Sequence, residues 1–320
     1  MNETDPRRDD SDKSGIIERA RGMLLGLAVG DALGATLEFG PRIASVKDYH
    51  REMTGGGPFG LEPGQWTDDT AMMLALSKSL TLRKGFDPVD VMGRFVLWYR
   101  TGEYSCTGIC FDIGGTTRAA LARFERTGEP FQGSTDEDTA GNGSLMRLAP
   151  VAIFGLDDEA EAIRIAREQS RLTHAHPACV DACDYFVRLL RLTILGEEDP
   201  IKLALVKWTG HPEVLRAKAA LWNGLARKDV RSTGYVIDTL EAALWAVAAS
   251  GSFEQAVVLA VSLGGDSDTI GAVAGALAGA KWGERSIPER WLKPLAWRHK
   301  IGAAALSLVR VSSDVHLHGA

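Results

Sequence analysis

Apolar residues recur every three or four positions along almost the whole chain, the spacing that places them on one face of an α-helix. Leu24, Leu27 and Ala28 follow this spacing near the start, and Met72 and Leu76 follow it further along. No alternating pattern of useful length indicates a strand. We therefore expect an all-α fold, a compact single-domain orthogonal helical bundle. Further helices are predicted over residues 89–99, 116–126, 159–171, 178–195, 200–208, 213–226, 236–249, 253–263, 269–282 and 301–311.

Two segments interrupt the helical pattern, residues 102–115 and 131–150, and both are rich in Gly, Ser, Thr and Asp. Long loops in a helical body often carry the functional site. No break in composition divides the chain, so we expect one domain over residues 15–312. Residues 1–14 are charged and lack the apolar core of a signal peptide, so we expect a disordered tail there and a second tail over 313–320.

Glycine forms two regular stripes, each with a period of four residues. Glycine inside a helix costs about 1 kcal/mol relative to alanine, so such stripes need a reason. They would let another backbone approach closely, either that of an unrelated helix for each stripe or that of the other stripe. We expect both helices to line a crowded centre. The stripes are Gly22, Gly26, Gly30 and Gly34, and Gly271, Gly275, Gly279 and Gly283.

Composition narrows the classes of protein that fit. The net charge of −6 gives no overall attraction to nucleic acid or anionic lipid. No apolar run reaches the roughly 20 residues of a membrane span, and we expect a cytoplasmic protein. The cysteines form two pairs with one-turn spacing, Cys106 with Cys110 and Cys179 with Cys183. Zinc is one reading, but buried thiols in a reducing compartment are favoured.

Two short acidic stretches resemble each other, and each opens a predicted helix. Hydroxyl and carboxylate side chains cap helix N-termini, so capping explains either stretch alone. Together they carry more negative charge than caps require. Carboxylate and hydroxyl oxygens without nearby His or Cys favour hard cations, and two such loops suit a pair of Mg²⁺ or Mn²⁺ ions. The stretches are Thr67, Asp68, Asp69 and Thr70, and Asp266, Ser267, Asp268 and Thr269.

Several blocks of the sequence, taken in order, resemble the ADP-ribosylglycohydrolase family, in particular its bacterial dinitrogenase-reductase-activating branch. The two acidic stretches and three of the four glycines of each stripe fall within these blocks. The resemblance extends from about residue 16 to residue 292 and implies a dinuclear metal cleft in an all-α fold. The blocks are residues 25–39, 64–70, 111–117, 141–147, 173–177, 235–239 and 264–279.

The resemblance also implies roles for individual residues. Glu38 matches an acidic position that coordinates a metal or activates water, and Asp112 matches a carboxylate facing the scissile bond. Asn142, Gly143 and Ser144 match a loop that contacts the distal ribose or the phosphates. The other implied substrate-binding residues are Gly115, His176 (with His174 less clearly) and Tyr235, and the implied metal ligands are Thr67, Asp68, Asp69, Asp266, Asp268, Thr269 and Glu38.

The resemblance implies a reaction, the hydrolysis of the N-glycosidic bond between ADP-ribose and a protein side chain. Arginine is the favoured side chain, and two divalent cations are the implied cofactors. Asp112 or Glu38 would take a proton from water or assist the leaving guanidine. Three alternatives stay open. The substrate could be a serine-linked or small-molecule adduct of ADP-ribose; the protein could neutralise a cognate ADP-ribosyltransferase by binding it; or the metal pair could serve a phosphohydrolase.

Overall fold

The computed structural model describes residues 6–205, 208–214 and 223–317. Within these residues the chain forms helices joined by loops and no strand, and three isolated β-bridges occur. The all-α prediction is confirmed. The α-helices are α1 Pro6–Gly34, α2 Asp68–Arg83, α3 Pro88–Thr101, α4 Gly115–Thr127, α5 Ala149–Phe154, α6 Glu159–Arg171, α7 Pro177–Leu195, α8 Pro200–Leu205, α10 Val236–Ala248, α11 Phe253–Val261, α12 Ser267–Trp282, α13 Glu289–Leu292 and α14 Arg298–Leu317.

Most predicted helices agree with these bounds to within three residues at each end. The clearest differences lie at the two ends of the chain. Helix α1 begins at Pro6 and α14 continues to Leu317, so residues 6–14 and 313–317, which fall in the expected tails, are helical in the structure.

Two other predicted helices differ from the structure or lie partly outside the described residues. The helix expected over 213–226 falls largely on residues 215–222, which lie outside the described residues. Helix α8 ends at Leu205 in the described chain, and Trp208 is not helical. Helices α5 and α13 were not predicted, because each is too short to show a repeating apolar pattern. The loop from residue 35 to residue 67, which the sequence did not single out, joins α1 to α2.

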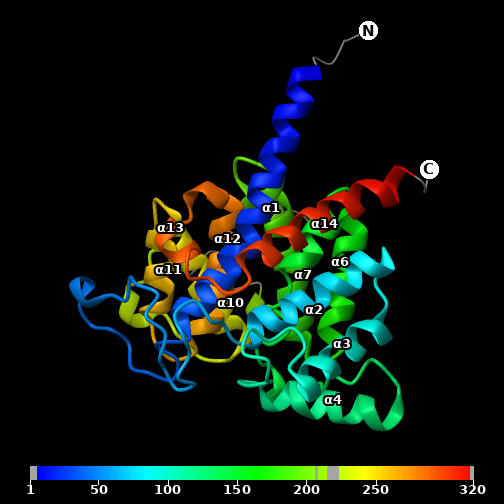
Figure 1. Cartoon of the computed structure of the whole chain (residues 1–320), viewed down its shortest axis with the longest axis horizontal. Coiled ribbons are helices and arrows are strands. Elements are labelled where there is room, and N and C mark those ends of the chain that lie inside the picture. Colours follow the sequence, from blue (N-terminus) through cyan, green and yellow to red (C-terminus); the bar gives the residue numbers. More distant parts are fainter. Residues whose placement is uncertain (1–5, 206–207, 215–222, 318–320) are drawn as a thin grey trace.

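Helices α1 and α12 pack side by side at the centre of the molecule, and α10, α11 and α14 pack around them (Figure 1). The glycine stripes make this contact. A Cβ atom added to Gly30 would lie 1.9 Å from the carbonyl oxygen of Gly271, and one added to Gly26 would lie 2.3 Å from that of Gly275. The prediction that the stripes line a crowded centre is confirmed, and the two helices run antiparallel.

The antiparallel arrangement brings the carboxyl end of α1 to the amino end of α12. The Ser267 hydroxyl donates a hydrogen bond of 2.8 Å to the Gly34 carbonyl oxygen, where the stripes end. The residues that follow α1 and those that begin α12 therefore meet.

No helix in the described part of the chain is long and apolar enough to cross a membrane.

Candidate metal centre and cleft

The first acidic stretch is held in place by Asp31, a fully buried carboxylate on α1. Its Oδ1 accepts from the Thr67 backbone N–H at 2.9 Å and from the Thr67 hydroxyl at 3.0 Å. Its Oδ2 accepts from the Thr70 backbone N–H at 3.0 Å and from the Thr70 hydroxyl at 2.6 Å. Asp31 thus fixes the amino end of α2 against the central helix pair.

Capping does not account for either acidic stretch. Thr67 and Asp266 occupy the N-cap positions of α2 and α12, and neither side chain makes a capping hydrogen bond. Elsewhere in the chain Asp87, Asp158 and Ser252 do cap their helices with side-chain oxygens. The oxygens of Thr67 and Asp266 are therefore available for other partners.

The two stretches converge on one cluster of carboxylates. Oxygen atoms of Asp31, Asp69 and Asp268 lie within 4.8 Å of one another, and so do oxygen atoms of Glu38, Asp112 and Asp268. Asp268 belongs to both groups, which gives two adjacent positions that a cation fits. The Thr67 hydroxyl lies 3.2 Å from Asp69 Oδ2 and 3.3 Å from Asp268 Oδ2, although it carries a single proton.

Three buried oxygens of this cluster have no hydrogen-bond partner: Glu38 Oε2, Asp69 Oδ1 and Asp268 Oδ1. Buried polar atoms are almost always paired, so unpaired carboxylate oxygens facing one another call for a positive ion. All donors in the cluster are oxygens, the set that Mg²⁺ and Mn²⁺ prefer. The residues present therefore fit a pair of hard divalent cations.

Burial and mutual repulsion raise the pKa values of these carboxyl groups. Burial, followed by repulsion from Asp112, raises the pKa of Glu38 to about 9. Burial is also the main cause that raises the pKa of Asp112 to about 7 and that of Asp31 to about 6. The pKa values of Asp68, Asp69 and Asp268 are raised well above the ordinary range by burial and then by neighbouring carboxylates. Nearby cations would offset this repulsion.

A cleft of about 470 Å³ opens onto the cluster. Its walls come from the loop after α1, the amino ends of α2, α4 and α12, and the loop before α5. No heavy atom lies within 4 Å of a Cβ built on Gly114 or Gly115, so the backbone at the start of α4 is open to a ligand. The cleft is lined by Glu38, Phe39, Phe59, Asp68, Asp112, Ile113, Gly114, Gly115, Thr116, Thr117, Arg118, Gly141, Asn142, Gly143, Met146, His174, Gly234, Asp266, Asp268 and Thr269.

Most of the predicted site residues meet at this cleft. Asp69 and Thr67 lie in the cluster beneath it. Asn142 joins the two parts of the site, because its amide donates to Asp266 Oδ2 at 2.9 Å and to the Thr239 hydroxyl at 2.8 Å. The predicted residues in the cleft wall itself are Glu38, Asp68, Asp112, Gly115, Asn142, Gly143, Asp266, Asp268 and Thr269.

Three predicted substrate-binding residues do not line the cleft. Ser144 is buried, and its hydroxyl accepts a hydrogen bond of 2.8 Å from Ser170. His176 caps α7 by accepting from the Ala178 backbone N–H at 3.2 Å, since the chain turns into a helix at that point. The Tyr235 hydroxyl donates to Glu213, while its backbone pairs with Gly141.

His174, the less clearly implied histidine, lies in the cleft wall in place of His176. It follows the turn after α6 and forms an isolated β-bridge with Ser134. Burial and then the charge of Arg147 lower the pKa of His174 to about 3, so its ring is neutral. Its Nδ1 lies 2.8 Å from the Thr173 hydroxyl, which fixes the ring.

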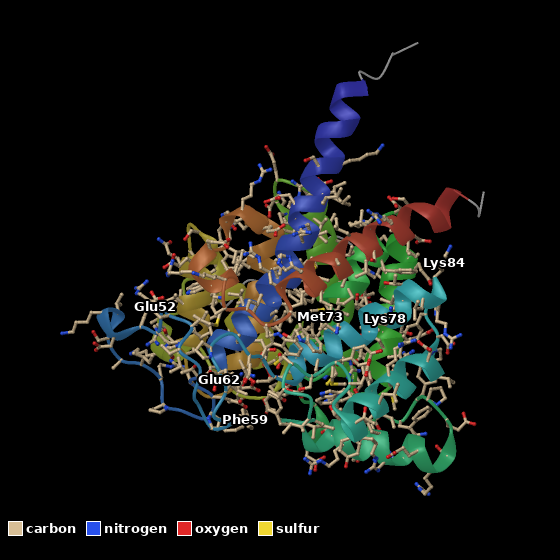
Figure 2. All side chains as sticks on the ribbon, in the orientation of Figure 1. Glu52, Phe59, Glu62, Met73, Lys78 and Lys84 are labelled. Carbon is tan, nitrogen blue, oxygen red and sulfur yellow. The ribbon has the colours of Figure 1, made fainter. Side chains whose placement is uncertain are left out.

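Sequence reasoning missed Asp31, Phe39, Phe59 and Arg118. Asp31 had a signal, because it is the one acid between Arg21 and Glu38 and it directly follows a glycine of the stripe. An ionisable side chain in such a segment is buried with partners or is functional. Phe59 lies on the loop that joins α1 to α2, where no periodic pattern marks it (Figure 2).

Comparison with known proteins gives consistent findings. The profile of the ADP-ribosylglycohydrolase family matches residues 12–316. A Pseudomonas putida (strain GB-1) protein named ADP-ribosylarginine hydrolase Tri1 is 42% identical over 292 residues, covering 91% of this chain and 78% of that protein. The ADP-ribosyl-dinitrogen reductase glycohydrolase of Rhodospirillum rubrum is 36% identical over 288 residues, covering 88% and 91%. A solved structure titled ADP-ribosylglycohydrolase-related protein complex matches with a TM-score of 0.82 and 41% identity, covering 93% of this chain and 99% of that one.

Proposed function

This chain belongs to the ADP-ribosylglycohydrolase family, and from that premise we propose that it is a metal-dependent hydrolase that releases ADP-ribose from arginine side chains of modified proteins. The observation that carries the proposal is a pair of adjacent three-carboxylate clusters that share Asp268. They contain unpaired oxygens and lie at the base of an open cleft. The arginine linkage is supported by relatives named for it that are 42% and 40% identical.

Two divalent cations, Mg²⁺ or Mn²⁺, are the cofactors that we propose. Their ligands would come from Thr67, Asp68, Asp69, Asp266, Asp268, Thr269 and Glu38, with Asp31 beside them. When bound, such a pair supplies positive charge that orients ribose hydroxyls and makes water more acidic. The sharing of Asp268 by the two groups supports adjacent ions, and the Thr67 hydroxyl lies 3.3 Å from Oδ2 of this carboxylate.

Backbone amides at the cleft suit the diphosphate of ADP-ribose. Helix α4 presents its amino end, with Gly115 in its first turn, and Arg118 lies one turn further on. A helix amino end and a glycine-rich turn both bind phosphate oxygens. Gly143 and Asn142 form the facing wall. The backbone of Tyr235 pairs with that of Gly141 and so would support this wall, and Ser144 directly follows Gly143 in it, whereas His176 caps α7.

Asp112 and Glu38 carry the proton transfers in this proposal. Both line the cleft and belong to the same cluster of carboxylates as Asp268, whereas Asp31 and Asp69 are buried beneath the cleft. Hydrolysis breaks the bond between the ribose carbon and the guanidine nitrogen, and an oxygen of water replaces that nitrogen. One carboxylate accepts the proton of the water and the other assists the leaving nitrogen. Negative charge around the ribose stabilises the positive charge that develops on it.

Peptides carrying ADP-ribose on arginine or on serine test the linkage. Wild-type protein with Mn²⁺ should release intact ADP-ribose from the arginine-linked peptide, leaving unmodified arginine, as read by mass spectrometry. The variant Asp268→Asn should lose at least about 100-fold in rate, typical for removal of a charge-stabilising group. Preference for the serine-linked peptide would reassign the substrate, and cleavage within the diphosphate would favour a phosphohydrolase. Hydrolysis of the arginine linkage by Asp268→Asn at the wild-type rate would contradict the proposal.

A second function, binding to a cognate ADP-ribosyltransferase, is favoured by the amino end of α1. This charged part of the helix extends beyond the helical body (Figure 1). A projecting helix can reach a partner that the cleft cannot. Deletion of residues 1–14 should then abolish inhibition of a transferase while hydrolysis continues; inhibition by the deleted protein would exclude this role.

We also propose one domain over residues 15–312 and a cytoplasmic location. Helix α1, at the beginning of that range, packs against α12 and against α14, which spans its end, and this supports a single unit. The cysteines are free thiols, with Cys179 and Cys183 buried, as proteins of a reducing compartment have them.

A further inference from the structure

Phe39 combines two unfavourable features at the mouth of the cleft. It is 72% exposed, the largest exposed fraction among the bulky apolar residues of the described chain. Its backbone has φ 58°, a left-handed conformation that costs an ordinary residue about 1–2 kcal/mol. Exposure and strain at one residue of a binding cleft indicate a functional reason for both.

The surrounding backbone holds Phe39 in this conformation. Its N–H donates to the Gly265 carbonyl oxygen at 2.8 Å, and the Gly265 N–H donates to the Gly40 carbonyl oxygen at 2.9 Å. Gly265 directly precedes the second acidic stretch. The backbone of Phe39 is therefore fixed relative to both Glu38 and Asp266, and its side chain starts from a fixed point at the cleft.

Phe39 is part of a row of three aromatic rings. Its centroid lies 6.5 Å from that of Phe59, and the centroid of Phe59 lies 5.3 Å from that of Phe111. Phe39 and Phe59 line the cleft, and Phe111 immediately precedes Asp112. Aromatic surface and carboxylates thus adjoin at one part of the wall, whereas Gly141 and Gly143 adjoin His174.

The chemistry of this wall suits a flat cation. Aromatic faces attract guanidinium groups, and neighbouring carboxylates strengthen the attraction. In the substrate of the proposed reaction, the guanidinium of the modified arginine is bonded to the ribose carbon, next to Glu38 and Asp112. We propose that Phe39 and Phe59 form the surface against which this guanidinium lies and thereby select the arginine linkage. This inference rests on the proposed function.

Kinetics with an arginine-linked peptide, together with inhibition by free ADP-ribose, test the proposal. Phe39→Leu and Phe59→Leu keep an apolar side chain but remove the aromatic face. Each should lower kcat/KM for the peptide about 3- to 30-fold, the range of a cation–aromatic contact, and leave the inhibition constant of ADP-ribose unchanged. Phe39→Trp should retain kcat/KM, because indole is the best aromatic partner for a cation. Phe131→Leu is the control, since Phe131 is 50% exposed and lies outside the cleft lining.

Three results would overturn the proposal. Unchanged kcat/KM in Phe39→Leu and Phe59→Leu would show that the rings do not contact the guanidinium. An equal weakening of ADP-ribose inhibition would place the adenine on the rings instead. Failure of wild-type protein to cleave the arginine linkage would remove the proposed function itself, and this result is visible before any variant is compared. Because Phe39 is exposed, its variants decide the question even if Phe59→Leu does not fold.

Discussion

At the scale of the residue, Asp268 joins the two halves of the carboxylate cluster. Its oxygens lie near Asp31 and Asp69 on one side and near Glu38 and Asp112 on the other. Burial makes this proximity costly in the absence of cations, since like charges repel strongly where solvent is excluded. The site therefore stores unfavourable electrostatic energy that metal binding would relieve.

Asp69→Asn tests this energy without measuring activity. In metal-free protein the substitution should raise the free energy of unfolding by about 1 kcal/mol, because one of the repelling buried charges is removed. Wild-type protein at Mn²⁺ concentrations 100 times the dissociation constant should gain about 2.7 kcal/mol, and the variant should lose most of this gain. Thermal unfolding with EDTA and with Mn²⁺ measures both effects. A variant less stable than wild type in EDTA would contradict the account.

The pattern of the two acidic stretches predicted their carboxylates, the family resemblance added Glu38 and Asp112, and both missed Asp31. Asp68, Asp69, Asp266 and Asp268 occur in repeated acidic tetrads, so their pattern alone indicated a shared site. Asp31 stands alone in a helix, and only the fold brings the backbone of Thr67 to it. His174 lines the cleft whereas His176 caps α7. The sequence did not distinguish these roles, because they depend on the residue at which α7 begins.

At the scale of the element, the contact between α1 and α12 sets the geometry of the site. Carbonyl oxygens of each helix occupy the space that a Cβ of the other would need. Helices packed this closely cannot easily slide along each other. Glu38, just after α1, and Asp268, in the first turn of α12, therefore keep a fixed position relative to each other. The sequence predicted close packing from the period of glycine, whereas the choice of partner helix required the fold.

Gly30→Ala tests the tightness of the contact. The added Cβ would lie 1.9 Å from a backbone oxygen that cannot move independently, so we expect a loss of about 1–3 kcal/mol in the free energy of unfolding. Gly93→Ala in α3 is the matched control, because nothing lies within 4 Å of its added Cβ. That variant should gain about 0.5–1 kcal/mol. Equal effects of the two substitutions in chemical denaturation would contradict the account.

Helices α2 and α3 are joined by Asp90, whose carboxylate accepts from Ser79, Arg83 and Arg94. Burial opposes its ionisation, but these hydrogen bonds prevail and lower its pKa from 3.8 to about 2. A lowered pKa stabilises the fold above pH 4 and ceases to do so as the pH falls through 2.

Asp90→Asn should therefore cost about 1 kcal/mol at pH 7, after allowance for screening by nearby solvent. The difference from wild type should shrink as the pH falls from 4 to 2. Urea unfolding across this range provides the measurement. A difference that is constant with pH, or that grows on acidification, would show that the ionised carboxylate is not the stabilising group.

At the scale of the whole molecule, the cleft lies where the amino ends of α2, α4 and α12 converge. Helix amino ends carry partial positive charge, which lowers the cost of gathering carboxylates and favours phosphate. The order of elements along the chain did not reveal this convergence. It depends on loops such as residues 35–67, whose paths no local pattern predicts.

The central claim is that hydrolysis depends on a two-cation centre that shares Asp268. The most direct measurement is the rate of ADP-ribose release from an arginine-linked peptide as Mn²⁺ is added to metal-free protein, with bound Mn²⁺ counted by calorimetry. The account predicts negligible release without metal, full activity when two ions are bound per chain, and neither full activity nor two-ion binding in Asp268→Asn. Release by the metal-free protein at the full rate, or full activity of Asp268→Asn, would contradict it.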